Sequence, residues 1–179
     1  MDKIYIRTDM NDKIATGHMM RCVAIADALR KKKVEAIFII ADENAVNLLK
    51  NRNYKFIVLH TNWNDKEGEL PILQHHIQKL NIKKILVDSY EVTEKYFRKL
   101  HNWVRVMYID DLNLFSYEVD ALVCYANYWR KFQYAQWNDN VKKYLGVKYT
   151  PLRENFWNCE PHKIKDNVEC LLLLTGGTD

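Results

Sequence analysis

Glycine and proline are scarce in this sequence, which has only 5 glycines and 3 prolines among its 179 residues. Collagen-like and low-complexity chains are rich in these residues, so both classes are excluded. No apolar run approaches the roughly 20 residues that cross a membrane, and no leader-like segment precedes the first apolar run. We therefore expect a cytoplasmic protein that does not contact a membrane.

Cysteine is also sparse, and the spacing of its 4 residues excludes two kinds of framework. Cys22, Cys124, Cys159 and Cys170 lie far apart, with no Cys-x-x-Cys pair and no histidine at a matching spacing. Neither a disulfide scaffold nor a zinc site is indicated. We expect no metal, and we expect most of these cysteines to be small buried side chains.

Charge is nearly balanced, with 27 basic against 23 acidic residues and a net charge of +4. This mild excess favours small anionic ligands and does not require nucleic acid. The longest basic run, residues 30–33, ends a predicted helix, where cations complement the helix dipole. We therefore interpret the run as a solvated helix end and expect no nucleic-acid partner.

With 48% hydrophobic and 28% charged residues, the chain has enough apolar material for a globular core. Continuous apolar runs alternate with helix-forming segments, which is typical of parallel strands covered by helices on both faces. We predict an α/β fold with a Rossmann-like parallel sheet. The predicted strands span residues 4–6, 34–40, 55–59, 85–87, 104–109 and 121–123, and the predicted helices include residues 18–32, 43–51 and 93–100.

The first strand, loop and helix organise the rest of the chain. Free amides at the start of a helix suit an anion or a polarised group, and Thr16 and Gly17 stand at that point. Gly17 lets the backbone approach a ligand closely. His18 is the one side chain there that exchanges a proton near neutral pH, so it is the leading catalytic candidate at the mouth of the loop. The alternative is that His18 only caps or packs at the helix start.

Polar side chains follow several of the predicted strands. Ligands of open parallel sheets bind beyond the carboxyl ends of the strands, so we expect these side chains to gather at one edge with His18. They are Asp9, Asp88, Tyr90, Asp110 and Asp111. The alternative is that each aspartate caps the helix that follows it, which is a common role for this residue.

Three further segments have a clear character. Residues 60–69 are polar and are predicted to form an exposed loop, followed by a helix in which His75 and His76 lie on the surface. Residues 128–137 interleave aromatic and basic side chains, as in proteins that stack single-stranded nucleic acid. Their spacing also fits one helix with an aromatic face on the core, and we favour that interpretation.

The pattern of the last 22 residues indicates a linker and the start of a second domain. Residues 158–167 are polar and resemble a linker, and an apolar run at 168–174 is followed by Gly176, Gly177 and Thr178. Such a glycine-rich turn usually leads into a phosphate-facing helix. We expect the strand at 168–174 to be poorly anchored unless it pairs with a sheet. The predicted division is an N-terminal Rossmann-like domain over 1–157, a linker over 158–167, and the first strand and turn of a truncated nucleotide-binding domain over 168–179.

Six short motifs occur in order along almost the whole chain. They are Arg7-x-Asp9, Ile14-x-x-Gly17-His18-x-x-Arg21-Cys22, Asp88-Ser89-Tyr90, Ile109-Asp110-Asp111-Leu112, Gly146-x-x-Tyr149-x-x-Leu152-Arg153 and Gly176-Gly177-Thr178-Asp179. Through these motifs the chain resembles the N-terminal half of the UDP-2,4-diacetamido-2,4,6-trideoxy-β-L-altropyranose hydrolases of pseudaminic acid biosynthesis. It is similar in the same way to the related spore-coat polysaccharide proteins.

The resemblance implies a glycosyltransferase-B-like fold, in which two Rossmann-like domains face each other and the C-terminal one holds most of the UDP. It implies that His18 positions and activates water and that Tyr90 lines the sugar site. It also implies that Gly176, Gly177 and Thr178 begin the nucleotide-binding half. The implied partners are a UDP-sugar substrate and the missing C-terminal domain, with no metal and no cofactor.

The implied reaction is hydrolysis at the anomeric carbon of a UDP-diacetamido sugar with inversion, and neutral His18 takes the proton of the attacking water. We expect Asp9 to orient His18, because both belong to the same loop. The substrate-binding residues expected on this basis are Arg7, Thr16, Gly17, Arg21, Asp88, Tyr90, Asp110, Asp111 and Arg153.

Three positions depart from the pattern of this family and leave the identity of the sugar open: Ala15, Cys124 and Asn155. The family usually has glycine where Ala15 stands, so we expect the loop to be less able to adopt a positive φ there. Two other functions remain open. The same scaffold can transfer the sugar to an acceptor, and the chain can be a non-catalytic protein of surface-polysaccharide assembly.

Overall fold

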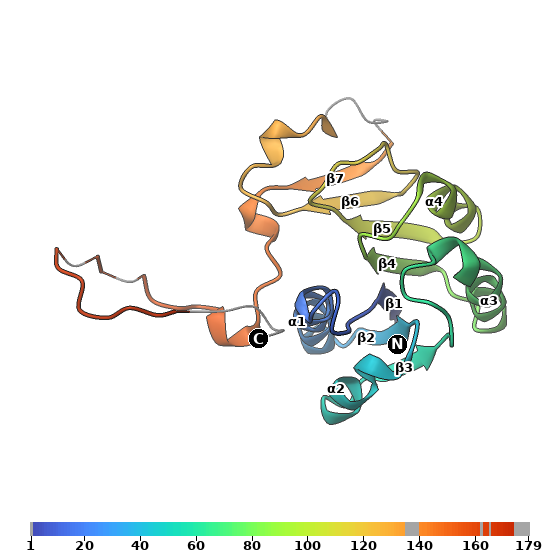
Figure 1. Ribbon diagram of the computed structural model, residues 1–179, viewed down its shortest axis with the longest axis horizontal. Helices are drawn as coiled ribbons and strands as arrows, with labels where there is room; N and C mark the ends of the chain where they lie inside the picture. Colours follow the sequence, from blue (N-terminus) through green and yellow to red (C-terminus); the bar gives the residue numbers. More distant parts are fainter. Residues whose placement is uncertain (1, 135–139, 162, 165, 174–179) are drawn as a thin grey trace.

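The computed structural model describes residues 2–134, 140–161, 163–164 and 166–173. Its centre is a seven-stranded sheet with the order β3-β2-β1-β4-β5-β6-β7, and every pair of neighbours is parallel (Figure 1). The strands are β1 (Lys3–Thr8), β2 (Glu35–Ile40), β3 (Lys55–Val58), β4 (Lys84–Asp88), β5 (Arg105–Ile109), β6 (Ala121–Cys124) and β7 (Lys142–Leu145). The order reverses between β1 and β4, which is the switch point of a Rossmann-like sheet.

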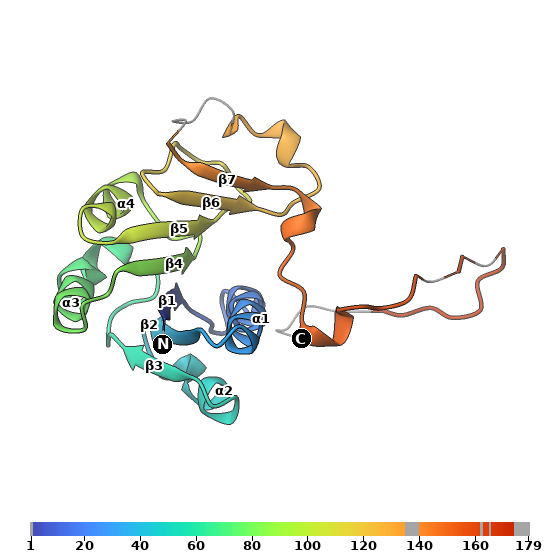
Figure 2. The ribbon, with the colours of Figure 1, turned by 180° about the vertical axis from the view of Figure 1, so that it is seen from behind.

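Helices cover both faces of the sheet, which confirms the predicted fold class (Figure 2). The α-helices are α1 (Gly17–Lys31), α2 (Val46–Asn51), α3 (Lys66–Lys79) and α4 (Glu94–His101). Shorter 3₁₀ turns are η1 (Glu43–Ala45), η2 (Trp129–Lys131), η4 (Val147–Tyr149) and η5 (Glu154–Phe156). Helices α1 and α2 lie on one face, and α3 and α4 lie on the other.

The core has two parts because successive side chains of a strand point to opposite faces. Ile6 of β1 and Leu86 of β4 belong to the cluster under α1 and α2, together with Phe38. Their neighbours Tyr5 and Ile85 belong to the cluster under α3 and α4. Both faces are therefore apolar, which explains why the strands read as continuous apolar runs in the sequence.

The predicted exposed loop over residues 60–69 is wrong at its end. Helix α3 begins at Lys66, and the side chain of Asp65 caps it by accepting a hydrogen bond from the amide of Gly68. Lys66 and Glu69 are 1% and 0% exposed. Their charges are paired inside the molecule, and the local polarity of a sequence does not reveal such a pairing.

The aromatic stretch from residue 128 does not form one helix over the described residues. The 3₁₀ turn η2 is followed by extended backbone at Phe132, while residues 135–139 lie outside the described part. Tyr134 is buried. The edge strand β7 has no counterpart in the prediction, because Lys142 and Lys143 make a weak apolar pattern. Lysines are common on edge strands, where they discourage pairing with other chains.

The predicted strand at 168–174 is not formed over the described residues 168–173, which are exposed. A strand needs the backbone of a neighbour, and none of the described ladders of the sheet includes this segment. Residue 174 and the predicted turn at Gly176, Gly177 and Thr178 lie outside the described part. Cys22 and Cys124 are buried, whereas Cys159 and Cys170 are exposed, so the prediction that most of the four cysteines are buried is wrong. Within the described ranges, no helix combines the length and the apolar character needed to cross a bilayer.

Candidate functional site

The first turn of α1 lies at the carboxyl edge of the sheet, beside the switch point between β1 and β4. Thr16 is the N-cap residue; its carbonyl accepts a hydrogen bond from Met20, and its side chain does not cap the helix. A Cβ atom added to Gly17 would meet no other atom within 4 Å, so the space in front of this residue is open. A ligand can therefore approach the backbone here without a clash.

His18 is oriented by a carboxylate from the neighbouring strand. Its Nδ1 lies 2.7 Å from Oδ1 of Asp88, the last residue of β4, and Asp88 is fully buried. A carboxylate accepts a hydrogen bond, so it favours the tautomer in which Nδ1 carries the proton. The other ring nitrogen, Nε2, is then a free proton acceptor, which is the arrangement of a general base.

Arg21 holds the same carboxylate from the next turn of α1. Its Nε donates to Oδ2 of Asp88, and its Nη2 forms an ion pair with Oδ1. Burial alone would raise the pKa of Asp88, but the hydrogen bonds from Arg21 and His18 outweigh burial and hold this pKa below its ordinary value. Asp88 is therefore a carboxylate that accepts from Arg21, from the thiol of Cys22 at 3.3 Å, and from His18, the candidate base.

Tyr90 covers the ring of His18. The two ring centroids are 4.5 Å apart at 81°, and the Tyr90 hydroxyl donates to Oδ2 of Asp111 at 3.0 Å. Burial and the carboxylate of Asp111 raise the pKa of Tyr90 to about 12, so its hydroxyl remains a donor at neutral pH. His18 itself is only 8% exposed, so the prediction that it lies open at the mouth of the loop is wrong. A small pocket on this side is lined by Asp9, Ile14, His18, Asp88, Ser89, Tyr90 and Glu91.

Asp9 does not orient His18, contrary to the prediction. Its Oδ1 accepts from the amide of Ala41 at 2.7 Å, and its Oδ2 accepts from Nζ of Lys66 at 2.7 Å. Burial opposes the charge of Asp9, but Arg7 and Lys66 overcome it and lower the pKa of this carboxyl to about 2. The carboxylate of Asp9 points toward Ala41, which follows β2, whereas His18 points toward Asp88, at the end of β4.

Arg7 is not a substrate-binding residue in this structure, because it is 0% exposed. Its Nε and Nη2 donate to the two carboxylate oxygens of Glu69 at 2.8 and 2.5 Å, and its Nη1 lies 2.7 Å from Asp9. Nζ of Lys66 lies 3.7 Å from Glu69 and closes a buried cluster of two positive and two negative charges. Lys66 and Glu69 were not predicted, because nothing local links the start of α3 to β1.

Asp110 also has a structural role in place of the predicted substrate contact. It is 1% exposed, and it accepts hydrogen bonds from the amides of Leu112 and Asn113 and from the hydroxyls of Tyr117 and Tyr134. These donors occupy both oxygens of the carboxylate. The turn-forming role that aspartate often plays therefore holds for this position.

Arg153 lies apart from the cluster around His18. Its guanidinium stacks on Phe156, 5.3 Å from the ring centroid, and it lines a separate pocket with Asp27, Arg52 and Asn155. The described part of the chain places no contact between Arg153 and His18. Cys124 is buried in the core on the α3 and α4 face. Cys124 and Asn155, two of the positions that differ from the family pattern, therefore do not contact His18.

Ala15 adopts a positive φ of 53°, the conformation for which alanine is expected to be less suited than glycine. The loop keeps the conformation because Asn11 accepts hydrogen bonds from the amides of Lys13 and Ile14 and forms a bridge with Ala15. An alanine in the left-handed region is strained by about 1 kcal/mol relative to glycine. The hydrogen bonds to Asn11 therefore hold the loop before His18 in this conformation despite the strain at Ala15.

We expect Ala15→Gly to raise the free energy of unfolding by about 0.5–1 kcal/mol, because glycine removes the strain at this φ. The measurement is urea unfolding followed by circular dichroism. Ala24→Gly, in the middle of α1, is the matched control and should lower the stability by about 1 kcal/mol. Loss of stability in both variants would contradict the strained conformation of Ala15.

In the described residues, no group of three or more histidine, cysteine, aspartate or glutamate side chains is arranged to hold a metal ion. The polar side chains that contact one another at this edge are His18, Asp88, Arg21, Tyr90 and Asp111. They combine a candidate proton acceptor, a buried carboxylate, a cation and a hydroxyl. Asp88, Tyr90 and Asp111 were predicted to gather at one edge with His18, and the structure brings them together. Arg21, which was predicted only as a substrate-binding residue, joins them through Asp88.

The known proteins to which this chain is similar include MJ1062 and MurG. The uncharacterized protein MJ1062 of Methanocaldococcus jannaschii is 23% identical over 187 residues, which cover 99% of this chain and 37% of that protein. The crystal structure of MurG from Acinetobacter baumannii matches with a TM-score of 0.52 and 9% identity, over 70% of this chain and 41% of that chain. This chain spans well under half the length of either protein. No family model matches it.

The likeness to MurG concerns the fold. MurG has the glycosyltransferase-B architecture, and the match covers 41% of its chain. This agrees with the strand order and with the position of the switch point beside α1. The predicted fold class, a Rossmann-like half of a glycosyltransferase-B-like architecture, is confirmed.

Proposed function

We propose that this chain forms one half of a nucleotide-sugar enzyme, in which His18 takes the proton of the hydroxyl that attacks the anomeric carbon. The observation that carries the proposal is the 2.7 Å contact between Nδ1 of His18 and Asp88, at the switch point of the sheet. Ligands of open α/β sheets bind at such a point. The likeness to MurG supports transfer of the sugar to an acceptor as the first candidate reaction.

The proposed step balances without a further reactant. The acceptor oxygen forms a bond to the anomeric carbon, its proton passes to Nε2 of His18, and the bond to the diphosphate breaks with its electron pair on the leaving group. Asp88 stabilises the imidazolium that results, through its bond to Nδ1. General-base catalysis of this kind contributes about 10²–10⁴-fold to a rate.

Hydrolysis is the second candidate, and the motifs around His18 and Tyr90 favour it because they resemble those of the UDP-diacetamido-sugar hydrolases. Water then takes the place of the acceptor, and the role of His18 is unchanged. In either reaction we propose that the nucleotide is held by a second domain that begins near Gly176, Gly177 and Thr178. The substrate-side contacts proposed for this chain are Gly17, Tyr90 and Asp111.

The test is release of UDP from UDP-N-acetylglucosamine and from a UDP-diacetamido-trideoxy sugar by the protein encoded by the full gene. Release is measured with and without a mixture of saccharide acceptors. We expect His18→Gln to lower the release rate by about 10²-fold or more, because glutamine cannot accept the proton. His75→Gln, on the exposed surface of α3, is the matched control and should leave the rate unchanged.

The two candidate reactions give different results. Release that needs an acceptor supports transfer, and release without an acceptor supports hydrolysis. Equal rates for the native protein and His18→Gln would remove His18 from the mechanism. Binding of the nucleotide sugars without release would overturn the proposed enzyme and favour an assembly protein.

A further inference from the structure

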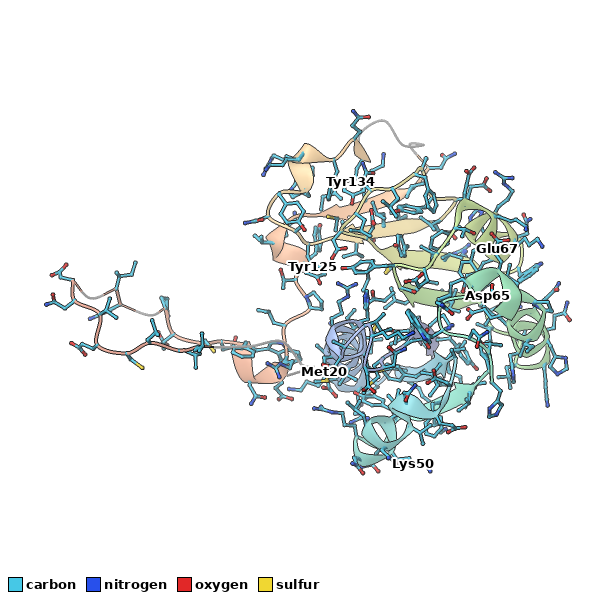
Figure 3. All side chains as sticks on the ribbon, in the orientation of Figure 1. Met20, Lys50, Asp65, Glu67, Tyr125 and Tyr134 are labelled. Carbon is cyan, nitrogen blue, oxygen red and sulfur yellow. The ribbon has the colours of Figure 1, made fainter. Side chains whose placement is uncertain are left out.

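The guanidinium of Arg21 points into the protein. A contact with substrate, as predicted from the sequence, would require it to point toward solvent. Nε and Nη2 engage Asp88, and Nη1 donates to the hydroxyl of Tyr125 at 2.7 Å, where Tyr125 follows β6 and faces α1 (Figure 3). Each of its three nitrogens therefore has a partner within the molecule. The side chain is 12% exposed. Arg21 is thus fully engaged by Asp88 and Tyr125 and has no nitrogen left for a substrate.

We propose that Arg21 is a positioning residue whose charge neutralises Asp88, so that His18 stays uncharged and keeps the Nε2 lone pair for an incoming proton. Nη2 of Arg21 lies 2.9 Å from Nδ1 of His18, and both groups point at the same oxygen of Asp88. A carboxylate oxygen can accept from both donors at once. This role rests on the proposed function, because it concerns the base of that reaction.

The other charges around His18 do not replace Arg21. Asp9 and Glu91 line the pocket beside the ring, and Asp9 is already paired with Lys66. Asp111 accepts from Tyr90 and lies 3.5 Å from Nη1 of Arg21. These neighbours carry negative charge, which favours the protonated ring. Among the described contacts of His18, Arg21 supplies the opposing positive charge.

Removal of that charge leaves His18 and the neutral thiol of Cys22 as the side-chain partners of Asp88. A carboxylate within about 4–6 Å favours the charged form of its partner and shifts the titration by about 1–3 pH units. His18 would then bind a proton at higher pH, and a protonated ring cannot act as a base. Arg21 therefore sets the pH range in which the enzyme works, without any contact to the substrate.

The experiment compares Arg21→Gln, which keeps a donor but loses the charge, with Arg21→Lys, which keeps the charge. The titration midpoint of His18 is followed by NMR on the full chain, with the exposed His60 and His75 as internal references. We expect Arg21→Gln to move the midpoint up by about one pH unit or more, and Arg21→Lys to move it by less than half of that. The acid limb of the pH–rate profile should move in parallel.

A midpoint that is unchanged in Arg21→Gln, or equal shifts in both variants, would overturn the proposal. If Arg21→Gln does not fold, Arg21→Met takes its place, because methionine also removes the positive charge, and an unchanged midpoint in that variant would contradict the role. The NMR measurement does not depend on turnover. A shifted midpoint without any nucleotide-sugar turnover would refute the proposed function and leave the role of Arg21 in place.

Discussion

The variant Asp88→Asn is expected to lower the catalytic rate by about 10⁴-fold, the size of effect seen when a buried aspartate behind a catalytic histidine loses its charge. The physical reason is the tautomer of His18. An amide does not require a proton on Nδ1, and Arg21, whose Nη2 lies 2.9 Å away, becomes the donor to that nitrogen. The proton then moves to Nε2, and the base is lost although the ring stays in place.

The rate measurement is paired with ¹⁵N NMR of the His18 ring, which distinguishes the two tautomers. Asp12→Asn, an exposed change in the loop before α1, is the matched control and should alter neither the rate nor the ring spectrum. A lost rate with Nδ1 still protonated would show that Asp88 acts in another way. An unchanged rate would remove Asp88 from the site.

Glu69→Gln is expected to destabilise the protein by about 3–5 kcal/mol, because it removes one of the two negative charges from a buried cluster. Arg7 and Lys66 would then share Asp9 alone, and the hydroxyl of Tyr96, which donates to Glu69 at 3.0 Å, would lose a charged acceptor. Native proteins are stable by only about 5–15 kcal/mol, so the loss is a large fraction of the total. Urea unfolding measures it.

Glu67→Gln is the matched control, because Glu67 belongs to the same turn of α3 and its ion pair with Lys95 lies near the surface (Figure 3). Its effect should be far smaller, since exposed pairs contribute little. The double variant Arg7→Met with Glu69→Leu removes one charge of each sign and should be more stable than Glu69→Gln. A double variant that is less stable would show that the cluster itself stabilises the fold.

The amino-acid sequence by itself determined the first six strands, the helices between them and their order along the chain. Apolar runs and helix-forming segments are local patterns, and they placed the first six strands within two residues at each end, together with α1 and α4. They also placed His18 correctly at the start of α1, because a strand, a polar loop and a helix follow one another directly in the chain. The parallel, doubly covered sheet followed from the alternation of these elements.

The tertiary structure alone decided the partners of the charged side chains. Asp9 is nearer to His18 in sequence, yet β4 pairs with β1 in the register that sets Asp88 beside Thr8 and presents it to α1. In the same way, Lys66 and Glu69 are predicted from the sequence to lie in an exposed loop. Only the packing of α3 over β1 brings Glu69 to Arg7 and buries both residues. Crossover connections bring together residues distant in sequence, and a buried charge is stabilised only by the partner it then meets.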